Sequence, residues 1–348
     1  MKRPELLSPA GSKEAFYAAI EAGCDAVYIG GYSFGARAFA SNFSNEEIIE
    51  CINYAHVYGV KVYVTVNTII YENEIPVFLN YIDFLHKNNV DAIIIQDLGM
   101  FDLIRKTYPN LELHASTQMH IHNLSGVKLA EKLGFKRVVL ARETSIDLLE
   151  EIKKNTNIEL EVFVHGALCV SYSGQCLMSS LIGGRSGNRG QCAGTCRLEY
   201  DLLDENGKQY NNDKYLLSTK DLNTLEKIGE LIELGIDSFK IEGRMKRPEY
   251  VYLVTKLYRK AIDNYLKYKK TLITDDDIKS LKKIYNREFT NGYLFNNKSI
   301  INQYRPNHLG ISIGKVIKKD NNKILIKLDE KISTGDGIRF LNKKEDTG

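Results

Sequence analysis

Four of the six cysteines in this 348-residue chain lie in one short stretch, and thiols grouped in this way could bind a metal. The spacing is C-x6-C-x15-C-x3-C, formed by Cys169, Cys176, Cys192 and Cys196. The residues between them are rich in Gly, Ser and Arg, which is typical of a loop. Four thiolates that converge suit a tetrahedral zinc ion or an iron–sulfur cluster.

The spacing alone leaves several kinds of cysteine site open. Structural zinc usually uses two close C-x2-4-C pairs, and only Cys192 and Cys196 form such a pair, so an iron–sulfur cluster is favoured over zinc. Thiols that bind no metal, or that act in redox chemistry, are the third alternative. Disulfides are the weakest option, because the opening MKRPELLSPAG has no apolar signal-peptide core.

Strand-like apolar runs alternate with helix-like segments along most of the chain. This pattern predicts a TIM-barrel-like (β/α)8 fold, with an open sheet of fewer strands as the alternative. Ser12 is the predicted N-cap of the first helix. The eight runs lie at residues 5–9, 26–30, 61–67, 92–97, 111–117, 137–142, 159–166 and 238–243.

The seventh run is followed by an insertion instead of a helix. The insertion contains the cysteine loop, residues 166–197, and then a predicted β-hairpin with its turn at 204–207. We expect this hairpin to lie over the barrel mouth. The cysteine loop would then lie beside the polar ends of the strands.

Three segments are expected along the chain. The barrel should span residues 1–270, and a helical connector should span 271–308. Residues 309–348 change to short alternating strands and predict a small β-barrel-like module. Because the chain ends directly after a strand, we expect this module to be truncated.

Composition excludes a membrane-spanning protein and indicates little about partners. No apolar run approaches the roughly 20 residues of a membrane helix, so a cytoplasmic protein is expected. A net charge of +3 is too small to indicate nucleic-acid binding by itself.

Polar side chains end several of the apolar strands. In a barrel such residues meet at the C-terminal face, where active sites are built. His165, four residues before Cys169, could donate to a substrate or to a cluster sulfur, with a buried structural histidine as the alternative. The other strand-end candidates are Asn67, Gln118, Arg142, Glu143, Lys240 and Glu242.

Cationic residues gather after the eighth strand and in the cysteine loop. Lys240, Glu242, Arg244 and Arg247 suit a small dianionic metabolite or an RNA backbone, with a solvated charge run as the alternative. Further positive charge comes from Arg185, Arg189 and Arg197 in the loop, and from Lys246, Lys256, Arg259 and Lys260 on the following helix.

Three histidines, His114, His120 and His122, fit no common zinc spacing. We interpret them as polar lining or surface groups.

The cysteine stretch also resembles a known family. Its pattern Glu161-x-Phe163-x2-Gly166-Ala167-Leu168-Cys169-x4-Gly174-x-Cys176-x-Met178-Ser179 resembles the full signature of peptidase family U32, the collagenase-like peptidases. The segments PELLSPAG, DAVYIGG and KIEGRMKRPEYV are also similar to that family, so the resemblance covers about residues 1–295.

The resemblance implies an activity and a cofactor. Members of that family take part in hydroxylating tRNA uridine, a cytidine of ribosomal RNA and the ubiquinone ring. Several of them bind a 4Fe-4S cluster through cysteines. The members that act on RNA are linked to prephenate. It therefore implies an enzyme that hydroxylates tRNA or rRNA with a prephenate-like oxygen donor. The four cysteines would hold the cluster, with zinc as the second choice of metal. The resemblance also implies RNA as a partner, and a second protein of the same family as a possible partner subunit.

This activity would use residues at the barrel face. The candidate catalytic residues are His165, Lys240, Glu242 and Arg244, and the candidate substrate rim comprises Asn67, Gln118, Arg142, Glu143, Arg185, Arg189 and Arg247.

Two other functions stay open at this point. A collagenase-like peptidase would need a nucleophile or a metal-bound water, and the sequence has no nucleophile elbow, HExxH motif or phosphate loop. An RNA-binding adaptor would use the cysteines as a structural metal site.

Overall fold

The computed structural model describes residues 2–37, 40–210, 214–320, 323–341 and 346–347. The chain divides into two compact units, Met1–Leu309 and Gly310–Gly348. The second unit contains two antiparallel pairs: β11 (Gly314–Asp320) with β12 (Lys323–Leu328), and β13 (Phe340–Leu341) with β14 (Asp346–Thr347).

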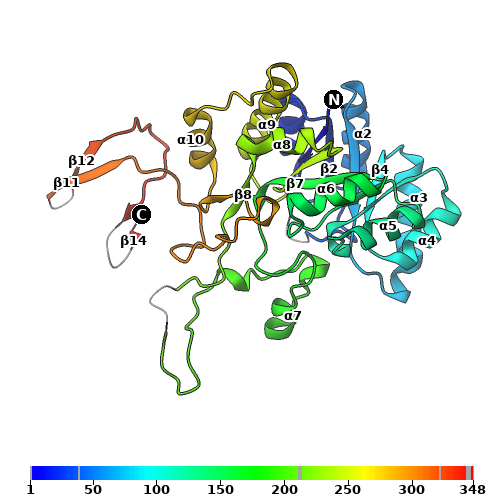
Figure 1. The fold of residues 1–348 in the computed structure, drawn as a ribbon, viewed down its shortest axis with the longest axis horizontal. Coiled ribbons are helices and arrows are strands. Elements are labelled where there is room, and N and C mark those ends of the chain that lie inside the picture. The colour runs from blue at the N-terminus through cyan, green and yellow to red at the C-terminus, as the bar shows by residue number, and fades with distance from the viewer. Residues whose placement is uncertain (1, 38–39, 211–213, 321–322, 342–345, 348) are drawn as a thin grey trace. The chain divides into compact units, whose positions relative to one another are not determined.

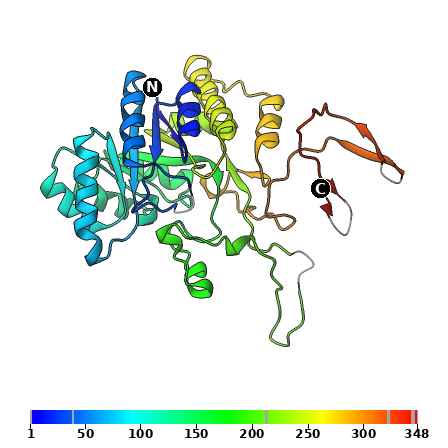
Figure 2. The same ribbon diagram turned by 180° about the vertical axis from the view of Figure 1, so that it is seen from behind.

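Eight parallel strands form a closed barrel in the first unit (Figures 1 and 2). Each strand pairs with the next along the chain, and the last, β9, pairs with both β7 and β1. This closure confirms the predicted TIM-barrel-like fold and excludes an open sheet. The strands are β1 (Glu5–Pro9), β2 (Ala26–Ile29), β3 (Lys61–Val66), β4 (Ala92–Ile95), β5 (Glu112–Ala115), β6 (Arg137–Val139), β7 (Glu159–Ala167) and β9 (Ser238–Ile241).

Helices surround the barrel, and several of them begin at a residue whose side chain caps the helix. Ser12 accepts a hydrogen bond from the backbone of Ala15, as predicted, and Ser44 and Glu47 form a capping box. The α-helices of this layer are α1 (Lys13–Glu21), α2 (Asn45–Val57), α3 (Ile75–Lys87), α4 (Leu98–Thr107), α5 (Leu124–Leu133), α6 (Ile146–Asn155), α8 (Ile228–Glu233) and α9 (Pro248–Tyr268). α10 (Asp275–Ile284) follows α9, and the 3-10 turns are η1 (Glu72–Glu74), η2 (Thr117–Met119), η3 (Gly187–Arg189), η4 (Thr195–Arg197), η5 (Leu225–Lys227) and η6 (Tyr293–Phe295).

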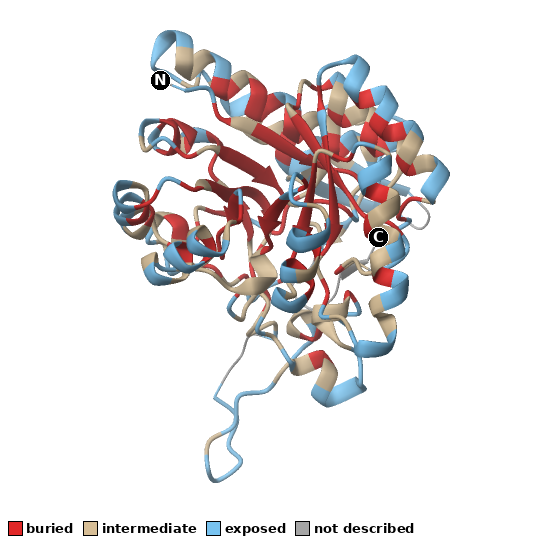
Figure 3. Ribbon diagram, turned by 90° about the vertical axis from the view of Figure 1, so that its right-hand side faces the viewer, coloured by how far each residue is buried: buried red, intermediate tan, exposed pale blue. Residues whose placement is uncertain are grey.

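The apolar faces of these elements form the core. Figure 3 shows buried residues concentrated in the strands and on the inner faces of the helices. Successive side chains of a strand point to opposite sides, so one set packs against the helices and the other fills the barrel. No helix in the described part of the chain is long and apolar enough to cross a membrane.

The insertion after β7 carries short elements. α7 (Met178–Gly183) lies within the cysteine loop, β8 (Asp221–Asn223) pairs antiparallel with the end of β7, and β10 (Phe289–Thr290) pairs with β8. A bridge between Leu203 and Gln209 confirms the predicted hairpin turn. Residues 201–210 are almost all exposed and extend away from the barrel in Figures 1 and 2, so the expectation that this hairpin lies over the barrel mouth is wrong.

Candidate functional site

A pocket opens at the C-terminal ends of the barrel strands. It contains about 420 Å³ of empty space, counting the part that is open to solvent. Its lining comes from the loops after β2, β3, β5 and β9 and from side chains inside the barrel: Tyr28, Ala36, Arg37, Thr65, Asn67, Ile94, Ser116, Thr117, Gln118, Phe163, Lys240, Glu242 and Arg244.

Glu242 is the carboxylate at the centre of this pocket. Its Oε2 accepts hydrogen bonds from Arg142 at 2.7 Å and from Arg37 at 3.1 Å. Burial alone would raise the pKa of Glu242, but Arg37, Arg142 and Lys240 hold it at about 2. Glu242 is therefore a carboxylate at neutral pH, and it holds two arginines from distant parts of the chain in place.

Arg142 lies flat against an aromatic ring. Its guanidinium carbon is 3.7 Å from the centroid of Phe163, which lines the pocket from β7. This contact is a cation–π interaction. The Arg142 Nε is buried and has no hydrogen-bond partner in the described structure.

Arg244 is buried beneath the pocket. It donates to Thr65 Oγ1 at 2.9 Å and to Asn42 Oδ1 at 2.5 Å, and burial lowers its pKa to about 10. A Cβ on Gly30 would collide with its guanidinium group, and one on Gly11 would collide with its carbonyl. The segments PELLSPAG and DAVYIGG therefore end in glycine where Arg244 needs the space.

Lys240 connects the pocket to a buried ionic network inside the barrel. Its Nζ lies 2.8 Å from Glu161 Oε1 and 4.5 Å from the centroid of Tyr28. Arg137 donates to Glu161 Oε2 at 3.1 Å. Burial alone would raise the pKa of Glu161, but Lys240 and Arg137 hold it at about 2.

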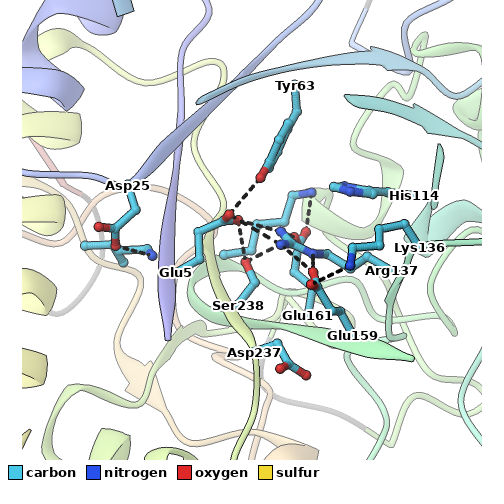
Figure 4. Close-up of polar contacts among 12 residues, drawn as sticks. Glu5, Asp25, Tyr63, His114, Lys136, Arg137, Glu159, Glu161, Asp237 and Ser238 are labelled. Carbon is cyan, nitrogen blue, oxygen red and sulfur yellow. Dashed lines mark hydrogen bonds and ion pairs between the residues drawn. The ribbon is translucent and has the colours of Figure 1, made fainter. Parts of the chain in front are cut away.

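The lower part of the network is centred on Arg137 (Figure 4). Its guanidinium contacts Glu5 at 2.5 Å and Glu159 at 2.8 Å, and Tyr63 donates to Glu5 at 2.7 Å. His114 lies beside these groups at full burial, with its ring 4.9 Å from that of Tyr63. His114 therefore belongs to the barrel interior.

His165 faces away from the pocket. The pairing of β7 with β9 shifts between Phe163 and His165, so a bulge reverses the direction of the following side chain. The imidazole instead lies among Tyr250, Tyr258 and Phe289, and burial lowers its pKa to about 4. The structure thus places it as a buried structural histidine, without contact to the pocket.

The cysteine loop is clasped to the barrel at both ends. Arg197, which follows Cys196, donates to Thr219 Oγ1 at 2.6 Å and to the carbonyl of Leu168 at 3.4 Å. Leu168 directly precedes Cys169, so this arginine joins the first and last cysteine regions. The charge of Arg197 at the rim stays a prediction, and its guanidinium also bonds Leu168 in the loop and Ser218 and Thr219 beyond it.

Two further contacts hold the middle of the loop. Arg189 donates to Glu74 at 2.6 Å and lies 4.7 Å from the ring centroid of Tyr71, in the connection between β3 and α3. Glu143 accepts from the backbone of Ser173 at 3.2 Å. Arg189 and Glu143 therefore fasten the loop to the barrel face.

The remaining rim residues differ in their surroundings. The Asn67 side chain accepts from Ala36 and donates to Ser116, which links three loops. Arg185 donates to the carbonyl of Gln191 within the cysteine loop, and Arg247 is exposed at the N-cap of α9.

The cations of α9 do not extend the pocket. Arg259 lies 2.9 Å from Asp25, at the opposite end of the barrel, and Lys260 pairs with Asp277. Arg259 and Lys260 therefore do not add to the positive charge at the pocket.

The four cysteines of the loop carry free thiols near one another. Burial raises the pKa of the Cys169 thiol, and charge on Cys176 and Cys196 raises it further. Burial also raises the pKa of Cys196, and Cys192 acts in the same direction. The donor chemistry suits an iron–sulfur cluster or zinc. Among the described residues, no three His, Cys, Asp or Glu side chains are gathered closely enough to hold a metal, so cofactor binding stays a prediction.

Sequence reasoning missed two charged residues of this region, Arg37 in the pocket and Glu161 in the ionic network inside the barrel. Arg37 has no recognisable motif, and its partner Glu242 is far away in the sequence. Glu161 stood in the signature without an assigned role, although a charged residue within the apolar run ELEVFV is itself a signal of a polar barrel interior.

The fold and the site together define a (β/α)8-barrel protein with a cationic pocket beside a clasped cysteine loop. Comparison with known sequences identifies the family. The chain belongs to peptidase family U32, whose sequence model matches residues 11–304.

Curated relatives within that family carry different names. The chain is 40% identical to the "23S rRNA 5-hydroxycytidine C2501 synthase" of Escherichia coli over 99% of its length, but spans only 54% of that relative. It is 37% identical to "tRNA hydroxylation protein P1" of Bacillus subtilis, covering 97% of this chain and 83% of that one. It is 36% identical to the "Collagenase" of Porphyromonas gingivalis, covering 83% of this chain and 73% of that one.

Proposed function

We propose that this chain hydroxylates a pyrimidine base of RNA, either a tRNA uridine or an rRNA cytidine. The observation that carries the proposal is the cationic pocket beside the cysteine loop, in a chain similar over nearly its whole length to two RNA hydroxylation proteins. Since the chain spans about half of the E. coli relative, the activity of the whole protein is part of the proposal.

The pocket suits a small dianion as oxygen donor, as a prephenate-like dicarboxylate would be. Arg37, Arg142, Lys240 and Arg244 are cations at the pocket, whereas Glu161 and Glu242 are the only carboxylates among the described residues in contact with them. The cations at the pocket outnumber the carboxylates that contact them, so positive charge is left to a ligand. Arginine donors bind carboxylates through paired hydrogen bonds, so the guanidinium groups would bind and orient the donor.

The cysteines would hold the cofactor of this reaction. A 4Fe-4S cluster bound by Cys169, Cys176, Cys192 and Cys196 would supply electron-transfer or Lewis-acid chemistry. The chain itself contributes the clasp of the loop through Arg197, which keeps the thiols near the pocket face. Glu242 contributes by orienting Arg37 and Arg142.

The experiment is a comparison of nucleosides in RNA. Mass spectra of tRNA and rRNA nucleosides from a deletion strain should lack one hydroxylated pyrimidine, and the wild-type gene should restore it. Unchanged spectra in both RNA pools would contradict the proposal. A Cys169→Ala variant that folds, binds RNA and fails to restore the nucleoside would exclude an RNA-binding adaptor.

A peptidase activity has less support in the pocket. Among the described residues that line it there is no histidine to activate a nucleophile, and Ser116 is hydrogen-bonded to Asn67. Turnover of collagen or casein by purified protein, abolished by Glu242→Gln, would favour the peptidase instead.

A further inference from the structure

Three ring side chains form a cluster between the β5–α5 connection and the cysteine loop. The rings of His120 and His122 are 4.6 Å apart, and Tyr172 lies 5.3 Å from His120 and 6.3 Å from His122. Tyr172 is 57% exposed, so solvent reaches this group of rings.

The ring cluster adjoins the pocket through Gln118. Gly174, two residues after Tyr172, packs so closely on Gln118 that a Cβ there would lie 2.8 Å from the Gln118 carbonyl oxygen. Gln118 in turn lines the pocket. A ligand on the rings would therefore lie beside the cationic pocket.

The cluster also presents buried hydrogen-bonding atoms without partners. In the described structure, the Gln118 Oε1 and the His120 Nδ1 are both buried and unpaired. His120 is held in the left-handed region, with φ 57°, and its carbonyl lies 2.9 Å from His122 Nδ1. A buried polar atom normally has a hydrogen-bond partner, and a ligand held on the adjacent rings would supply one for these two atoms.

We propose that Tyr172, His120 and His122 form a stacking platform for an unpaired nucleobase of RNA. Tyrosine and histidine rings are the side chains on which proteins stack single-stranded bases, and amide and imidazole groups read the base edges. Gln118 and His120 would bond such an edge after their side chains turn toward it, because both unpaired atoms are buried in the described structure. This inference rests on the proposed function, because it takes RNA to be the substrate, and it adds where a base beside the pocket is held.

The test uses the fact that the chain contains no tryptophan. In a Tyr172→Trp variant the new indole is the only one, and a base stacked on it should quench its fluorescence. The probe is a short single-stranded RNA of mixed sequence, added to anaerobically purified protein. Binding is measured separately from the anisotropy of the same RNA carrying a fluorescent label.

Tyr58→Trp provides a matched control. Tyr58 is 60% exposed and has a ring neighbour, Tyr54, at 5.0 Å, which resembles the surroundings of Tyr172. It caps α2 just before β3 begins, at the end of the barrel opposite the pocket. Single-stranded RNA should bind both variants but quench only the tryptophan of Tyr172→Trp.

Two substitutions separate stacking from general packing. Tyr172→Leu should weaken single-stranded RNA binding by roughly 5- to 100-fold, because one stacked base is lost. Tyr172→Phe should retain wild-type affinity, since it keeps the ring.

The outcomes distinguish the platform from the function. The platform is wrong if anisotropy shows that RNA binds, RNA leaves the fluorescence of Tyr172→Trp unchanged, and Tyr172→Leu binds RNA with wild-type affinity. In that case the proposed RNA function still stands. Quenching by duplex RNA as strongly as by single-stranded RNA would also overturn the platform. If the wild type binds no RNA at all, both are overturned.

Discussion

Replacing Glu161 with glutamine tests the buried ionic network directly. Glu161 is fully buried and accepts from Lys240 at 2.8 Å, Arg137 at 3.1 Å and Ser238 at 3.2 Å. Glutamine keeps the shape of the side chain but removes its charge. The ammonium of Lys240, itself only 4% exposed, would then lose its direct carboxylate partner.

Two routes give a similar magnitude for this loss. Removing one partner of a buried ion pair typically destabilises a protein by about 3–5 kcal/mol. Independently, a pKa of about 2 against the ordinary 4.5 corresponds to about 3 kcal/mol at neutral pH. We therefore expect Glu161→Gln to lower the free energy of unfolding by about 3 kcal/mol.

The assay is urea unfolding of the purified variants followed by circular dichroism. Glu150→Gln is the matched control, because Glu150 is 53% exposed and pairs with Lys154 on the surface. Such an exposed pair contributes roughly 0.3–0.5 kcal/mol. Adding Lys240→Met to Glu161→Gln should recover much of the loss, since the unpaired cation is then absent.

The pH dependence follows from the lowered pKa of Glu161. Its stabilisation is fully present above the ordinary pKa of 4.5 and is lost as the pH falls toward 2. The wild type should therefore lose its advantage over Glu161→Gln across that window. The reasoning would be refuted if the free energy of unfolding of Glu161→Gln at pH 7 lay within about 1 kcal/mol of the wild-type value. It would also be refuted if the difference between the two proteins did not change as the pH falls.

Three further predictions concern the cysteine stretch. Gly166→Ala should lower the free energy of unfolding in urea by at least about 2 kcal/mol, because φ is 106° and the new Cβ would lie 2.5 Å from the Glu242 carbonyl oxygen. Gly59→Ala is the control, because Gly59 has a φ of 68° and open space around it, and this change should cost about 1 kcal/mol. Arg197→Gln should speed proteolysis within the loop, and wild-type rates would show that the clasp is unimportant. Cys192→Ser should lower the iron content of anaerobic protein without changing helicity, whereas one zinc and no iron in the wild type would contradict the cluster.

Much of the fold could be predicted because it depends on local patterns. Apolar runs with period two, helix-period segments and the cap at Ser12 arise from neighbours in the sequence, and the structure confirms the eight strands and their closure. The spacing of the four cysteines likewise indicates their loop from the sequence alone. Strands, helices and caps depend on contacts within about ten residues, which a single sequence displays, whereas closure pairs Glu5 with Ser238 and was inferred from the number of repeats.

The detailed site was decided by tertiary structure. Arg37 and Arg142 meet on Glu242 only because the barrel brings together loops that are far apart in the chain. His165 was expected at the pocket from its place in the strand, but one bulge turned it toward α9. Arg197 was expected to add charge to the rim, and the structure shows in addition that it clasps the loop. The alternation of side chains along a strand predicts which residues share a face of the sheet. The register between strands, the bulges and the long-range partners of a side chain depend on packing that the local sequence does not encode.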